Sequence, residues 1–189
     1  MTGSAFINPL WIAAFYGLSE ILISSVLRAR SGKDSDQGSL KIIWLTVNVC
    51  MTGAIVAYLA LPSAAFGHNA SVYWTGFAMF AGGIALRWYA IAYLGRFFTV
   101  NVAVAADQRV IDTGPYRWVR HPSYTGSLLA FAGVGLLLAN SVSLVLTTLP
   151  IIIAFLHRMR IEEAALLQGL GDAYRRYMQR TTRLIPKVY

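Results

Sequence analysis

Two clusters of polar residues, about forty positions apart in the sequence, have the side chains best suited to chemistry. The first is Arg120-His121-Pro122-Ser123-Tyr124. Pro122 suits the first turn of a helix, where its missing N–H would be unpaired in any case. The free amides of such a helix start, beside Arg120 and His121, can receive a carboxylate or another anion. A loop that anchors its arginines and aromatic rings at lipid headgroups explains the same residues without any chemistry.

The second cluster is Arg158-Met159-Arg160-Ile161-Glu162-Glu163. Arg158 and Glu162 are four residues apart and therefore share one face of a helix, with Glu163 on the adjoining face. An exposed ion pair at the end of an apolar helix would contribute little to stability. Near a helix that starts at Pro122, the same residues would instead line a cleft. The pattern leaves both interpretations open.

Two further ionisable residues, Glu20 and Arg87, lie inside apolar runs. Ionisable groups are costly within a membrane, so a functional role is the default hypothesis. For Glu20 we expect a structural role or exposure to a cavity rather than catalysis. Arg87 could contact a substrate or pair with a structural partner such as Glu20. We expect no metal, because the sequence has no His/Cys/Asp set with the spacing of metal ligands. It also lacks the Gly-rich loops that bind nucleotides and the Gly-x-Ser-x-Gly motif of hydrolases.

The composition indicates a membrane protein, because 57% of the residues are hydrophobic and only 13% are charged. A soluble domain carries about 25% charged residues. Apolar runs of about twenty residues, the length that crosses a bilayer as a helix, recur along the chain. We predict an all-α, polytopic integral membrane protein with about five transmembrane helices, the last two forming a hairpin. The expected runs are 9–27, 42–61, 72–94 and 124–157, the last broken at Ala139-Asn140-Ser141.

The basic residues predict the orientation of the chain. Fifteen of the sixteen Lys and Arg residues fall in segments on one side of these spans, and the sixteenth is Arg87. The positive-inside bias makes that side cytoplasmic, with the N-terminus outside and the C-terminus inside. We interpret the net charge of +8 as favouring contact with the anionic headgroups of the bilayer, and we expect no nucleic-acid partner.

At these clusters the sequence resembles the isoprenylcysteine carboxyl methyltransferase family. The resemblance runs from Leu94-Gly95-Arg96-Phe97-Phe98-Thr99 through Gly114-Pro115-Tyr116 to Arg120-His121-Pro122-Ser123-Tyr124-Thr125-Gly126. It resumes at Glu162-Glu163, at 170–177 and at Arg183-Leu184-Ile185-Pro186. It therefore covers roughly 87–186, half of the chain. The most specific element is Arg-His-Pro-x-Tyr-x-Gly, followed about forty residues later by Glu-Glu.

The resemblance implies a membrane methyltransferase that uses S-adenosylmethionine, bound by cytoplasmic segments before the fourth span and after the fifth. It places the catalytic role on Arg158, which would face the acceptor, and we add Arg87 to it. Residues carried over to the cofactor site by position are Asn101, Gln108, Val110, Ile111, Tyr116, His121, Pro122, Ser123, Tyr124, Glu162 and Glu163. We expect 1–94 to form an N-terminal three-span region and 95–189 to form the methyltransferase core.

The implied acceptor is a lipophilic or lipidated molecule with a carboxylate of the isoprenylcysteine type. A short chain of this kind is typical of a prokaryotic inner (plasma) membrane. Small thiols, phenolic or pyrone lipids, fatty acids and amino-headgroup lipids are further acceptors that the sequence leaves open. Two other functions also remain open: a membrane reductase of the sterol-reductase type, which would use a nicotinamide dinucleotide, and a lipid-binding protein without turnover.

Overall fold

The computed structural model describes residues 38–67, 69–98 and 107–188, together with positions 8, 11, 14, 15, 17 and 18. Most of the predicted first span, with Glu20, and the predicted site residue Asn101 lie outside the described residues. The described part is all-α, as predicted. Its helices are α2 (Ser39–Ala60), α3 (Ala70–Leu94), α4 (Pro122–Leu137), α5 (Ser141–Leu170) and α6 (Asp172–Arg180), with 3-10 turns η2 (Pro62–Ala64), η3 (Gly95–Phe97) and η4 (Gly114–Arg117).

Local sequence signals explain where these helices begin. The side chain of Asn69 caps α3 by accepting a hydrogen bond from the backbone N–H of Val72, 2.9 Å away. Asn140 caps α5 in the same way through the N–H of Ser143, at 3.0 Å. Asparagine is a favoured N-cap because its side-chain oxygen pairs an otherwise orphaned amide. Pro122 is the first residue of α4, as predicted, and the predicted hairpin break at Ala139-Asn140-Ser141 separates α4 from α5.

Among the described residues, three helices are long and apolar enough to cross a membrane: α2, α3 with its extension to Phe97, and α5. Helix α4 has 16 residues, or about 24 Å at 1.5 Å per residue, slightly less than the ~30 Å hydrocarbon core. Helix α5 has 30 residues and is about 45 Å long, so it continues well beyond that core. The chain is a multi-pass integral membrane protein.

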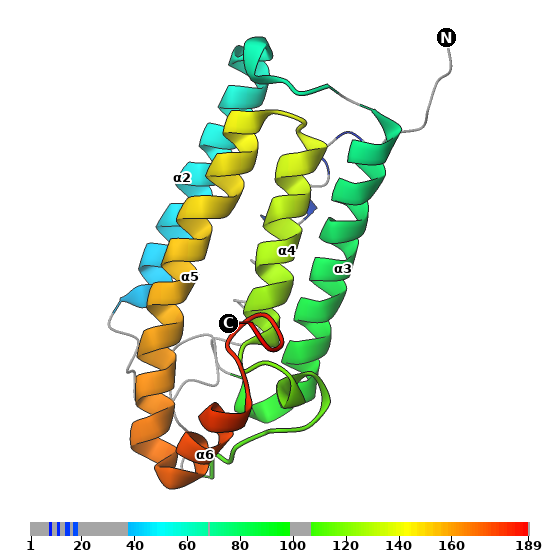
Figure 1. Cartoon of the computed structure of the whole chain (residues 1–189). Coiled ribbons are helices and arrows are strands. Elements are labelled where there is room, and N and C mark those ends of the chain that lie inside the picture. Colours follow the sequence, from blue (N-terminus) through cyan, green and yellow to red (C-terminus); the bar gives the residue numbers. More distant parts are fainter. Residues whose placement is uncertain are drawn as a thin grey trace.

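The bundle is organised around the α4–α5 hairpin, with α3 packed on α4 and α2 packed on α5 (Figure 1). The α3–α4 contact is close because glycines face each other. A methyl group on Gly83 would lie only 2.5 Å from the backbone oxygen of Gly126. Polar groups join α2 to α5 near the turn of the hairpin, where the Ser143 hydroxyl at the start of α5 donates to the Ala54 carbonyl at 2.7 Å.

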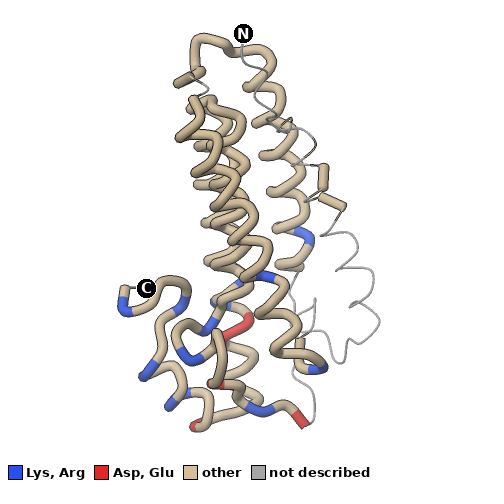
Figure 2. Tube along the Cα trace, turned by 90° about the vertical axis from the view of Figure 1, so that its right-hand side faces the viewer, with Lys and Arg blue, Asp and Glu red and all other residues tan. Residues whose placement is uncertain are grey.

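Charged residues gather at one end of the described molecule, where α5 ends and α6 lies (Figure 2). Helix α6 is amphipathic: Tyr174 and Tyr177 are buried, whereas Arg175 and Arg176 are exposed. The predicted one-sided distribution of basic residues therefore appears in the fold as a charged lobe beneath an apolar bundle. The two polar clusters of the sequence meet where this lobe joins the bundle.

Candidate functional site

Glu163, on α5, lies at the centre of the site, with its carboxylate buried among three basic side chains. Arg120 Nε donates to Oε1 at 2.8 Å, and His121 Nε2 lies 3.2 Å from the same oxygen. Arg183 Nη2 donates to Oε2 at 2.8 Å. The side chains of Glu163, His121 and Arg120 are only 5%, 4% and 8% exposed. We call these four residues the Glu163 cluster.

The backbone explains how segments about sixty residues apart deliver these side chains. The N–H of Arg120 donates to the carbonyl of Thr182 at 2.8 Å, and that of His121 donates to the carbonyl of Arg183 at 3.0 Å. The Arg120 guanidinium also donates to the carbonyls of Met178, at 3.2 Å, and Thr181. The C-terminal tail is thus paired with the residues that start α4. Arg120 and His121, which the sequence suggested could receive an anion, thus bind the carboxylate of Glu163, a residue of the chain itself.

A second set of contacts joins Arg158 to Glu162 through Tyr124. Arg158 Nε donates to the Tyr124 hydroxyl at 2.9 Å, and that hydroxyl donates to Glu162 Oε2 at 2.8 Å. Arg158 Nη1 also donates to Ser39 Oγ, at the first residue of α2, at 2.8 Å. The Tyr124 ring is stacked between the rings of His121 and Phe155, with centroids 5.5 and 5.1 Å away.

The two carboxylates of the Glu-Glu pair differ in their surroundings. Glu163 is enclosed, whereas the Glu162 side chain is 32% exposed. The nearest ring nitrogen of His121 is 4.0 Å from Glu162 Oε2. Glu163 therefore organises the side chains around it, and Glu162 presents negative charge at the edge of the site.

Arg87 meets α4 from the side of α3. Its Nη1 donates to the Ser127 hydroxyl at 2.8 Å, and that hydroxyl donates to the Ser123 carbonyl at 3.0 Å. Arg87 and Arg158, the two predicted catalytic residues, thus both bind side chains in the first turns of α4. The possible Arg87–Glu20 pair lies outside the described residues. Pro122 and Ser123, predicted for the cofactor site, are buried in the first turn of α4.

Tyr116, in η4, is buried next to α3 and α6. Its hydroxyl donates to the Ala90 carbonyl at 3.2 Å, and its own carbonyl accepts from the Tyr177 hydroxyl at 2.7 Å. Burial raises the pKa of Tyr116 well above its usual range, and the nearby Glu162 carboxylate adds to this shift. Burial likewise raises the pKa values of Tyr174 and Tyr177. These hydroxyls therefore remain neutral hydrogen-bonding groups at physiological pH.

The segment before η4 contains three more predicted residues, Gln108, Val110 and Ile111, all partly buried. The side-chain oxygen of Gln108 is buried and has no hydrogen-bond partner in the described structure. An unpaired buried oxygen is costly, so this atom fits a hydrogen-bond donor from a bound molecule.

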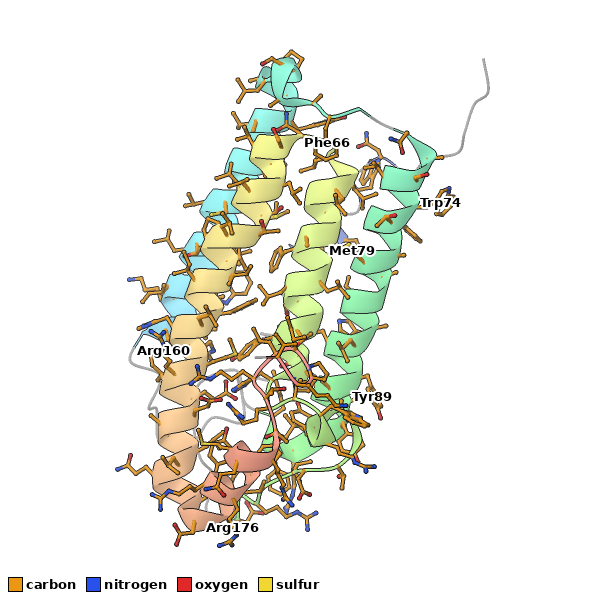
Figure 3. All side chains as sticks on the ribbon, in the orientation of Figure 1. Phe66, Trp74, Met79, Tyr89, Arg160 and Arg176 are labelled. Atoms are coloured by element: carbon orange, nitrogen blue, oxygen red, sulfur yellow. The ribbon has the colours of Figure 1, made fainter. Side chains whose placement is uncertain are left out.

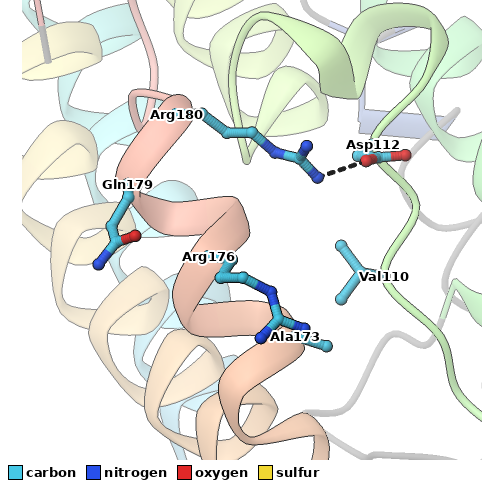
Figure 4. A pocket seen from close by; sticks show the side chains of 6 residues that line it. All are labelled: Val110, Asp112, Ala173, Arg176, Gln179 and Arg180. Carbon is cyan, nitrogen blue, oxygen red and sulfur yellow. Dashed lines mark hydrogen bonds and ion pairs between the residues drawn. The ribbon is translucent and has the colours of Figure 1, made fainter.

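A cavity of about 450 Å³ opens between this segment and α6 (Figure 4). Its lining includes Val110 on one side and Arg176 on the other, and an ion pair between Arg180 and Asp112 crosses from α6 to the loop. Of the predicted cofactor residues, Val110 lines this cavity. The cavity thus adjoins the predicted site through Val110.

Three partners in this site were not predicted from the sequence. Ser39 was not a candidate, because an isolated serine at a helix start carries no signal for a contact with α5. Arg183 belonged to a motif of the resemblance, but nothing in its spacing pointed to Glu163. Ser127 could have been suggested as the partner of Arg87 by the rule that an intramembrane arginine needs a polar neighbour.

Comparisons with known proteins show the family of this chain. The model of the isoprenylcysteine carboxyl methyltransferase family matches residues 74–168, half of the chain. A protein-S-isoprenylcysteine O-methyltransferase of Schizosaccharomyces pombe is 34% identical over 137 residues, covering 71% of this chain and 58% of that protein. Protein-S-isoprenylcysteine O-methyltransferase B of Arabidopsis thaliana is 32% identical over 115 residues, covering 60% and 58%.

A solved structure, that of the eukaryotic intramembrane Ras methyltransferase ICMT, superposes with a TM-score of 0.66 at 25% identity. The match covers 95% of this chain and 65% of that one. The chain spans about three fifths of the length of these curated relatives. The family match includes Arg87, His121, Arg158 and Glu163, which the fold brings to one end of α4. The chain belongs to the isoprenylcysteine carboxyl methyltransferase family.

Proposed function

We propose that this protein transfers a methyl group from S-adenosylmethionine to the carboxylate of a lipophilic acceptor of the isoprenylcysteine type. The observation that carries the proposal is the meeting of the two family motifs. The turn from Arg120 to Tyr124 and the pair Glu162-Glu163 are about forty residues apart in sequence, yet they bind each other directly in the fold. Family membership supplies the reaction class.

The donor site in this proposal is made by the segment before α4 and by α5. Glu162, whose side chain is about one third exposed, offers negative charge to a cationic donor, and the unpaired oxygen of Gln108 accepts one of the donor's N–H groups. The Glu163 cluster holds His121 in place. The remaining residues proposed to line the site are Asn101, Val110, Ile111, Tyr116, Pro122, Ser123 and Tyr124.

The chemistry requires alignment rather than a strong base. S-adenosylmethionine supplies a methyl group already activated by the sulfonium sulfur. The residues of the chain then have to orient the two substrates and exclude water. Tyr116, which is buried, and Tyr124, which is partly buried, serve this purpose, since they wall the site without offering a competing nucleophile at neutral pH.

Arg158 is proposed to bind the acceptor carboxylate. A guanidinium is planar and matches a carboxylate with two parallel hydrogen bonds. Its contact with Tyr124 sets the acceptor group beside the Glu162 end of the donor site. Arg87, bound to Ser127, is proposed as a second catalytic residue at the other side of α4. In this division, residues 1–94 form the three-span region and residues 95–189 form the methyltransferase core.

We further propose five spans, with the N-terminus outside and the charged lobe in the cytoplasm of a prokaryotic cell. The support is the gathering of Lys and Arg at one end of the bundle (Figure 2) and the positive-inside bias. Topology reporters fused after Gly67 and after Tyr189 should report opposite sides of the inner membrane. Two cytoplasmic signals would contradict the five-span arrangement.

Calorimetric titration of the purified protein with S-adenosylmethionine tests the donor. His121→Ala and Glu162→Ala should each weaken binding roughly ten- to a hundred-fold, because loss of a charged or ring partner costs about 1.5–3 kcal/mol. His157→Ala is the matched control, since His157 is an exposed histidine on α5, the helix that also carries Glu162. Absence of binding to the parent protein would overturn the proposal. Binding of a nicotinamide dinucleotide instead would favour the reductase.

A further inference from the structure

The backbone of Val119 pairs with that of Thr182 in the C-terminal tail. Trp118, the residue before Val119, and the end of the tail expose apolar side chains outside the proposed site. Trp118, Ile185 and Val188 are 56%, 53% and 74% exposed. Two exposed basic residues, Arg117 and Lys187, adjoin them in sequence. We call these five residues the tail patch. Backbone pairing of Thr182 and Arg183 with the start of α4 sets its position relative to the bundle.

The depth of the tail patch along the bundle follows from the α3–α4 contact. A methyl group on Gly126 of α4 would lie only 2.5 Å from the backbone oxygen of Gly83 and 2.6 Å from the backbone nitrogen of Arg87. Gly126 therefore packs directly against the backbone of α3 at these two residues. Thr125, the residue before Gly126, donates from its hydroxyl to the carbonyl of Leu184 at 2.8 Å. Leu184, the tail residue before Ile185, therefore lies at the same depth along the bundle as the part of α3 around Arg87.

That part of α3 has the features of a membrane–water boundary. Trp88, Tyr89 and Tyr93 are 44%, 53% and 39% exposed, and Trp and Tyr concentrate at such boundaries. Trp74 is exposed near the other end of α3, and both Trp74 and Tyr89 point away from the bundle (Figure 3). In Figure 2 the described part of the C-terminal tail lies beside the bundle, at the border between the apolar helices and the charged lobe.

The chemistry of the tail patch fits an anionic lipid surface. Its apolar side chains are too exposed to be part of the protein core, and its charges are basic. The Arg117 guanidinium lies over the Trp118 ring, 5.3 Å from the centroid, a pairing that places positive charge beside an interfacial aromatic. Lysine and arginine near a membrane attract anionic headgroups, while their stems and apolar neighbours reach the acyl boundary.

We propose that the tail patch inserts into the headgroup region of the leaflet on the charged side and binds anionic lipid there. The contact also supports the site, because the same tail carries Arg183, which donates to Glu163. Lipid bound to Ile185, Lys187 and Val188 would hold this arginine against its carboxylate. The inference rests on the depth and chemistry of the tail, independently of which molecule is methylated.

Site-directed fluorescence in nanodiscs tests the proposal. In a Cys50→Ser background, Val188→Cys carries an environment-sensitive dye, and Gln168→Cys, exposed near the end of α5, is the control. Phosphatidylcholine labelled with a doxyl group near the top of its acyl chain should quench the dye at position 188 at least about twofold more strongly than at 168, as for an interfacial segment. Equal quenching at both positions by aqueous iodide, with none by doxyl lipid, would overturn the insertion.

The choice of anionic lipid is tested in the same labelled protein. Adding phosphatidylglycerol to the nanodiscs should increase doxyl quenching at position 188. Combined Arg117→Gln and Lys187→Gln should remove that increase while leaving quenching in pure phosphatidylcholine, since the apolar side chains remain. A response to phosphatidylglycerol that is unchanged in the double variant would overturn the assignment of anionic headgroups to these two residues.

Discussion

Replacing Glu163 by glutamine should destabilise the charged lobe far more than the same change at its neighbour Glu162. The Glu163 carboxylate is 5% exposed and accepts from Arg120 and Arg183 and contacts His121. Glu163→Gln keeps the shape but leaves the buried Arg120 without its counter-charge. Removing one partner of a buried ion pair costs about 3–5 kcal/mol. For a protein of this size, that loss lowers Tm by about 6–20 °C.

The matched control is Glu162→Gln. Its carboxylate is 32% exposed and accepts from the neutral Tyr124 hydroxyl, a bond that an amide oxygen can also accept. The expected loss is therefore at most about 1 kcal/mol. Thermal unfolding in lipid nanodiscs, followed by tryptophan fluorescence, compares the two variants.

Hydrogen exchange locates the effect. The amides of Arg120 and His121 bond to the carbonyls of Thr182 and Arg183, so Glu163→Gln should increase exchange in the peptide that starts α4, whereas Glu162→Gln should not. The reasoning is refuted if Glu163→Gln melts within about 2 °C of the parent, a change below 1 kcal/mol. It is equally refuted if both variants lose the same stability.

Three further predictions concern the acceptor, the helix contact and alkaline pH. Arg158→Lys should lower turnover on a carboxylate acceptor at least about tenfold, because lysine lacks the planar fork, with donor affinity unchanged within a few-fold. Arg160→Lys, at an exposed position, should be neutral in steady-state kinetics, and equal losses would contradict a role specific to Arg158. Gly83→Ala should cost about 1–3 kcal/mol in thermal unfolding, as overpacking does, because its methyl would lie 2.5 Å from Gly126 oxygen. Gly82→Ala, with open space around it, should not destabilise, and similar melting of the two variants would argue against close α3–α4 packing. Because burial raises the pKa values of Tyr174 and Tyr177, their contribution to stability is fully present below about pH 10, the pKa of exposed tyrosine, and is lost as pH rises through the folded-state values. Tm measured against pH should therefore fall above about pH 10, and a smaller fall in a Tyr174→Phe/Tyr177→Phe variant identifies the two residues.

The apolar helices α2 to α5 of the described chain were predictable from local properties of the sequence. Hydropathy indicated α2 and α3, Pro122 indicated the start of α4, and the break at Asn140 indicated the hairpin. Each signal acts over a few residues: proline restricts its own backbone, and asparagine caps the amides that follow it. The distribution of Lys and Arg also predicted the charged end of the bundle. That prediction needs only the order of the apolar and basic segments along the chain.

The partners inside the site were decided by the tertiary structure. Helical spacing placed Arg158 and Glu162 on one face, as in the structure, but it could not show that Tyr124 connects them. It also could not show that Ser39, 119 positions earlier, accepts from Arg158, or that Arg183 reaches Glu163. Periodicity determines which side chains share a face, because it depends on the turn of one helix. Which faces meet depends on how all the helices pack, and the glycines between α3 and α4 and the pairing of the tail with α4 settle that packing only in the folded chain.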